Sequence, residues 1–118
     1  MPTVQPRRPN ARQNARQRRL SKALAEIDFA LPGSIEIRRT RCGTAGCACK
    51  AEPPQLHGPY VVWTRKVAAK TVTKVLSEDQ LHDYQGWLDN ARKLRALTRE
   101  LHDLTLEIVE NDPRSRRT

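Results

Sequence analysis

Three cysteines and one histidine fall within 16 residues of this 118-residue chain, and together they could hold a metal ion. Cys42, Cys47, Cys49 and His57 have the spacing C-x4-C-x-C-x7-H, and the chain has no other cysteine. Three thiolates and one imidazole can fill the tetrahedral shell of a Zn²⁺ ion. Four ligands leave no open coordination position, so we expect a structural zinc site. The alternatives are another metal or an iron–sulfur cluster, or three unconnected thiols, and His57 is the least certain ligand.

The segments around this cluster have the patterns of short β-strands. Residues 35–41 begin with alternating apolar side chains, residues 60–65 (YVVWTR) give the strongest strand pattern, and residues 71–76 return after a turn. Small residues between the cysteines allow the backbone to fold tightly around an ion. We therefore expect a zinc-stapled, three-stranded antiparallel sheet within residues 32–76. The ion should hold the strands so that their basic side chains point in one direction.

Helical patterns flank this expected sheet on both sides, which makes the fold class α+β. Apolar residues spaced by three and four predict an amphipathic helix over residues 16–31, ended by Pro32-Gly33. Ser77 and Gln80 fit a capping box at the start of a long acidic helix over residues 77–112.

The later part of this long helix repeats leucine in sevens, as a coiled coil does. The stripe could pack on residues 16–31 of the same chain, or on a second copy through residues 78–110. We favour the homodimer, because the stripe is longer than the first helix.

The net charge of +9 is unevenly distributed along the chain. Residues 1–22 carry seven basic residues and no acid, whereas residues 76–112 carry nine acids against four bases. We expect residues 1–15 to be a disordered basic arm and residues 113–118 a basic tail. Focused positive charge attracts phosphate backbones, so nucleic acid is the expected partner, with DNA favoured over RNA.

Candidate nucleic-acid contacts come from the basic arm, the strands and their neighbouring aromatic residues. Tyr60 and Trp63 could stack on bases or belong to the core. The full set is Arg7, Arg8, Arg12, Arg16, Arg18, Arg19, Arg38, Arg39, Arg41, Lys50, Tyr60, Trp63, Arg65, Lys66, Lys70 and Lys74.

Several classes of protein are disfavoured by the same sequence. No apolar run is long enough to span a membrane, and the arginine-rich N-terminus is unlike a signal peptide. Clustered cysteines without such a signal favour a cytoplasmic location. We find no nucleophile–base pair and no glycine-rich phosphate loop, so we expect neither an enzyme nor a small-molecule substrate.

The run GSIEIRRTRCGTAGCACK…HGPYVVWTR…KTVTKVL, followed by a leucine-striped helix, resembles an uncharacterised bacterial and archaeal family known only as a domain of unknown function. The resemblance covers about residues 32–110, and its most specific part is the core CG-x3-C-x-C…HGPY. It marks the four metal-ligand candidates together with Gly58, Pro59 and Tyr60, and it implies an association with mobile elements. The chain departs from the family pattern at residues 67–69, where a glycine-containing turn is usual.

These observations lead to three hypotheses of function. The first is a small zinc-stapled, DNA-binding accessory protein. The second is an adaptor or oligomerisation module that acts through the C-terminal helix, and the third is an RNA-binding protein.

Overall fold

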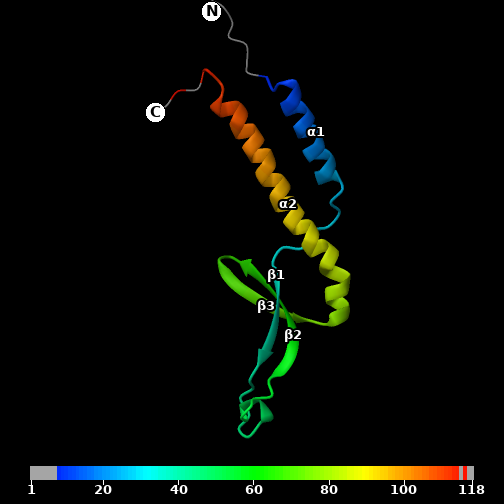
Figure 1. Cartoon of the computed structure of the whole chain (residues 1–118), viewed down its shortest axis with the longest axis vertical. Coiled ribbons are helices and arrows are strands. Elements are labelled where there is room, and N and C mark those ends of the chain that lie inside the picture. Colours follow the sequence, from blue (N-terminus) through cyan, green and yellow to red (C-terminus); the bar gives the residue numbers. More distant parts are fainter. Residues whose placement is uncertain (1–7, 115, 117–118) are drawn as a thin grey trace, which may run out of the picture. The chain divides into compact units, whose positions relative to one another are not determined.

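The computed structural model describes residues 8–114 and 116, and it confirms the α+β arrangement. The chain divides into a sheet unit, residues 31–89, and a helical unit formed by the residues before and after it. The elements, drawn in Figure 1, are α1 (Ala11–Ala25), β1 (Ser34–Thr40), a short 3-10 helix η1 (Ala48–Lys50), β2 (His57–Val67), β3 (Lys70–Leu76) and α2 (Glu78–Glu110).

The sheet is three-stranded and antiparallel, as the strand patterns predict, and its strands have the order β1-β2-β3. Arg38 pairs with Tyr60, but two residues later Thr40 pairs with His57. Two residues of β2, Gly58 and Pro59, therefore face a single residue of β1. Such a bulge bends the strand and marks the end of regular pairing.

A two-residue turn joins β2 to β3 although it contains no glycine. Val67 pairs with Lys70, and the two residues between them, Ala68 and Ala69, have φ angles of 50° and 67°. Positive φ at both central positions is the signature of a type I′ turn, whose twist matches that of the flanking strands.

The core of the sheet unit lies between one face of the sheet and the first turns of α2. Leu76 and Leu88 are almost fully buried. The backbone before β1 is held on both sides, because Leu31 donates its amide to the Trp87 carbonyl (2.9 Å) and the Trp63 indole donates to Pro32 (2.9 Å). The expected capping box of α2 is confirmed, since Ser77 and Gln80 exchange both hydrogen bonds.

In the helical unit, α1 packs beside the second half of α2 (Figure 1). Leu20 of α1 and Leu104 of α2 are buried, and Gln13 donates a hydrogen bond to Glu107 (3.3 Å). The leucine stripe of α2 thus packs on α1 of the same chain. This helical hairpin was the alternative to the favoured dimer. A dimer through residues 78–110 stays a prediction.

The prediction of an N-terminal helix over residues 16–31 was wrong at both ends. The helix begins at Ala11, because Asn10 and Gln13 form a capping box, so residues 11–15 are helical rather than disordered. It ends at Ala25, and the Asn90 side chain then binds Asp28 and the Phe29 carbonyl (2.9 and 2.8 Å) in a non-helical segment. The rest of the predicted arm, residues 1–7, lies outside the described residues.

No helix among the described residues combines the length and apolarity that crossing a bilayer requires.

Candidate metal centre

The paired ends of β1 and β2 bring the four predicted metal ligands together. Thr40 pairs with His57, so Cys42, two residues beyond Thr40, lies next to the histidine that begins β2. Cys47 caps η1 and Cys49 lies within it, in the loop that joins the two strands (Figure 1). The sheet thus positions two ligands and the loop supplies the other two.

The ligand atoms are close enough to share one ion. All four lie within 4.8 Å of one another. The Sγ atoms of Cys42 and Cys49 are 3.7 Å apart, and Cys47 Sγ is 3.3 Å from His57 Nε2. Zn–S bonds of about 2.3 Å at tetrahedral angles place two sulfurs about 3.8 Å apart, which agrees with the first distance. The cluster can therefore hold a metal ion, and the donor set fits zinc.

The loop backbone supports the sulfurs with hydrogen bonds. The Cys42 amide donates to Cys49 Sγ (3.4 Å), the kind of second contact that orients and stabilises a thiolate ligand. Cys49 is fully buried, while the other three ligands are half-buried. Lys50 donates to the Thr44 carbonyl (2.7 Å), which ties η1 to the segment between the first two cysteines. This loop is held by its own contacts around the cluster.

The thiols of the cluster differ in acidity. The backbone hydrogen bond of Thr44, followed by hydrogen bonds of His57 and Cys47, lowers the pKa of Cys42 to about 6. At Cys47 the backbone hydrogen bond of Cys49 lowers the pKa, but the side chains of Cys49 and Cys42 outweigh it and raise the pKa overall. Cys42 therefore ionises more readily than Cys47.

Gly58 allows β1 and β2 to approach each other beside the cluster. Its φ is +110°, and a Cβ atom there would lie 2.8 Å from the Arg38 carbonyl oxygen and 2.9 Å from the Tyr60 nitrogen. Only glycine fits this position without strain. The HGPY motif of residues 57–60 thus combines a ligand with the glycine that permits the bulge.

The basic residues of the sheet do not share one face, contrary to the expectation from the sequence. The register places Arg38, Tyr60 and Lys66 on one face and Trp63, Arg65, Lys70 and Lys74 on the other. Arg39 lies at the bulge, and Arg41 and Lys50 lie in the loop. The physical reason is alternation, because neighbouring strand residues point to opposite faces whatever their charge.

Several of these side chains have partners within the chain. Arg38 forms a salt bridge with Glu36 (2.9 Å), and the Arg65 guanidinium lies 4.4 Å from the centre of the Trp63 ring. Lys66 donates to the Thr71 hydroxyl (3.0 Å). Trp63 is half-buried on the face covered by α2, whereas Tyr60 is 39% exposed on the opposite face.

The candidate arginines of the N-terminal segment lie on and just before α1. Arg8, Arg12, Arg18 and Arg19 are exposed, while Arg16 is half-buried. Arg7 lies outside the described residues.

The sequence interpretation missed a group of residues on α2 that faces Trp63. Gln80, Tyr84 and Trp87 line a cavity together with Trp63 and Lys74. Their spacing of four and three residues on one helix face was the available signal.

Comparison with known proteins gives one family. No curated protein and no solved structure matches the chain. The model of DUF6788, a domain of unknown function, matches residues 11–86, so it includes α1, the sheet and the first turns of α2. Since this match covers more than half of the sequence, the chain belongs to the DUF6788 family.

Proposed function

We propose that this protein is a zinc-stapled accessory protein that binds nucleic acid, with DNA favoured over RNA. The observation that carries the proposal is the basic outer face of α1. Arg12, Arg19 and Lys22 follow each other at spacings of seven and three, which places them on one side of the helix. All three are exposed, and residues 11–25 contain no acid.

These basic side chains are available for phosphate. Among the described residues, none of the three forms a salt bridge. Arg18 adds a fourth exposed cation beside them. Phosphate contacts release counterions from the nucleic acid, which supplies most of the affinity of a basic surface of this kind.

The metal has a structural role in this proposal. Zinc is the ion of choice because three thiolates and an imidazole give it a closed tetrahedral shell. Holding Cys42 and His57 to one ion would fix the ends of β1 and β2, since a small core gains stability from such a staple. A closed shell also argues against catalysis. A cytoplasmic, mobile-element setting in bacteria or archaea belongs to the same proposal.

Salt dependence of duplex binding tests the role of α1. We expect zinc-loaded full-length protein to bind a labelled 20-base-pair duplex in fluorescence anisotropy, with log Kd rising by roughly 5–7 per unit of log salt concentration. The variant R12Q/R19Q/K22Q should lower this slope by about 3, because it removes three phosphate contacts.

The matched control is R92Q/R95Q/R99Q, which removes the same charge from exposed positions of α2. It should change the slope by less than one. No binding at about 50 mM salt, or an equal effect of the two triple variants, would show that α1 is not a nucleic-acid surface.

A second candidate function, an oligomerisation module or adaptor acting through α2, is favoured by one observation. Leu94 and Leu106 are 37% and 54% exposed on a helix that already packs on α1. Sedimentation velocity over a hundredfold range of protein concentration would show a concentration-dependent dimer. A monomer at every concentration would rule out the homodimer.

A competition experiment among duplex DNA, single strands and structured RNA separates DNA binding from RNA binding.

A further inference from the structure

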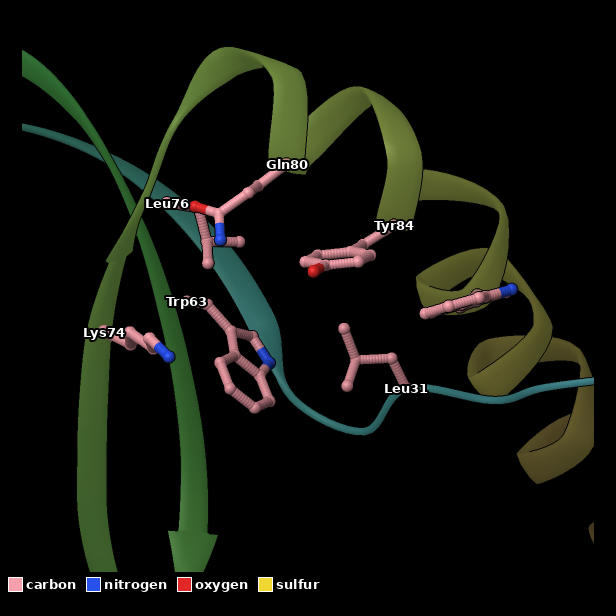
Figure 2. Close-up of a pocket in the computed structure, with 7 residues that line it drawn as sticks. Leu31, Trp63, Lys74, Leu76, Gln80 and Tyr84 are labelled. Carbon is pink, nitrogen blue, oxygen red and sulfur yellow. The ribbon is translucent and has the colours of Figure 1, made fainter.

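The sheet unit contains a cavity that is separate from the Cys/His cluster and from the basic face of α1. It has a volume of about 220 Å³ and is lined by residues of the sheet, of α2 and of the segment before β1 (Figure 2). The lining residues are Leu31, Trp63, Lys74, Leu76, Gln80, Tyr84 and Trp87. Pockets for drug-sized ligands measure about 300–1,000 Å³, so this one suits a smaller ligand, such as a single ring system.

Aromatic rings form the walls of this cavity. Trp63 comes from the sheet and Tyr84 from α2, and the two rings face the same space (Figure 2). Tyr84 is stacked on Trp87, with ring centres 5.4 Å apart and planes inclined by 17°. Flat rings on two sides favour a flat aromatic ligand, which can stack on either of them.

The Trp63 ring is held in place before any ligand arrives. Its indole nitrogen donates to the Pro32 carbonyl (2.9 Å), and the Arg65 guanidinium covers the ring at 4.4 Å. Because the ring is already held in one position, binding a ligand against it costs less conformational entropy.

Gln80 and Lys74 give the cavity hydrogen-bond donors, while the Tyr84 hydroxyl can either donate or accept. Gln80 uses its Oε1 to accept the Ser77 amide (2.9 Å), which leaves its NH₂ group as a donor, and Figure 2 shows this nitrogen turned toward the cavity. Lys74 is the one charged residue among the lining residues and adds an ammonium group. Donors and a positive charge select a ligand with acceptor oxygens and a negative charge, and they disfavour a cationic ligand.

We propose that the cavity binds one unpaired nucleobase that carries a ring keto oxygen, namely thymine, uracil, cytosine or guanine but not adenine. The base would stack against Trp63 and Tyr84, with its keto oxygen accepting from Gln80 and its phosphate near Lys74. The proposal rests on the proposed function, which it deepens, because a base becomes accessible in this way only in a single strand or an opened duplex.

Intrinsic fluorescence reports on this site directly, because both tryptophans of the chain line the cavity. Zinc-loaded full-length protein is titrated with thymidine monophosphate, with ten-residue oligo(dT) or oligo(dA), and with a duplex. Labelled strands in parallel report binding by anisotropy. We expect oligo(dT) and thymidine monophosphate to quench the fluorescence, and oligo(dT) to bind at least about fivefold more tightly than oligo(dA).

Two variants and one control test whether oligo(dT) binding and quenching depend on the cavity residues. Lys74→Gln should weaken oligo(dT) binding about three- to tenfold, and Tyr84→Leu should abolish quenching. Lys93→Gln removes the same charge from an exposed position outside the cavity and should have a smaller effect than Lys74→Gln. Circular dichroism confirms that each variant is folded.

The outcomes separate the two proposals. Oligo(dT) that binds by anisotropy without changing the fluorescence overturns the cavity as a base site and leaves the proposed function standing. Quenching by thymidine monophosphate without binding of any strand at low salt supports the cavity and overturns the proposed function. Equal affinity for oligo(dT) and oligo(dA) overturns the selection of a keto base, and an equal loss in the two lysine variants overturns the role of Lys74.

Discussion

Gly33 lies where the chain enters β1, and a side chain there would collide with its surroundings. Its φ is +110°, and a Cβ atom would lie 2.5 Å from the Thr64 carbonyl oxygen and 2.6 Å from the Trp63 indole nitrogen. Gly86 of α2 is the opposite case, since nothing lies within 4 Å of its would-be Cβ. One glycine is therefore required by contact and conformation, and the other only weakens its helix.

These two glycines give substitutions of opposite sign. Gly33→Ala should lower the free energy of unfolding by about 2 kcal/mol or more, because strain and a displaced Trp63 act together. Gly86→Ala should raise it by roughly 0.5–1 kcal/mol through helix propensity. Urea unfolding followed by circular dichroism measures both. A neutral Gly33→Ala would mean that the segment before β1 does not pack against Trp63 as described.

The four residues of the candidate metal site could be identified individually from the sequence. The contacts of the basic side chains could not. Cysteine and histidine have few other reasons to cluster at this spacing, and the structure brings all four within 4.8 Å. Arginine and lysine occur on any exposed surface. Whether Arg38 meets Glu36 or a phosphate depends on the neighbours that folding provides.

At the scale of elements, the β2–β3 turn is a site of backbone strain. Ala68 and Ala69 both adopt positive φ, a region that costs a residue with a Cβ atom about 1–2 kcal/mol. Asparagine and glycine adopt it more readily, and they dominate natural type I′ turns.

Replacing this pair should stabilise the hairpin. We expect A68N/A69G to raise the free energy of unfolding by roughly 1–2 kcal/mol, and Ala68→Val, which is β-branched, to lower it. Thermal and urea unfolding of the zinc-loaded protein provide the comparison. If A68N/A69G left stability unchanged or reduced it, the turn would not have the conformation seen here.

The strands and the start of α2 could be predicted because their signals are local. Alternation and β-branching mark residues 60–65, and Ser77 with Gln80 marks the cap. The bounds of α1 could not be predicted from apolar spacing, because its start depends on the Asn10 cap and its end on a tertiary contact with Asn90. The faces of the sheet were misjudged for a similar reason, since they follow from strand register.

The two units of the molecule provide different proposed sites. The helical unit provides the basic face of α1, and the sheet unit provides the Cys/His cluster and the aromatic cavity. Few side chains are deeply buried among the described residues, namely Leu20, Cys49, Val62, Leu76, Leu88, Ala91 and Leu104. In a protein with so small a core, a covalent or metal constraint adds a large share of the stability.

Native mass spectrometry of the protein purified from zinc-supplemented cells shows whether Cys42, Cys47, Cys49 and His57 hold a zinc ion. We predict one Zn²⁺ per chain, lost in the Cys49→Ser variant and on chelation, with the thiols protected from alkylating reagents until the ion is removed. A metal-free chain whose three thiols react freely while its circular dichroism stays native would show that the fold does not depend on a zinc site.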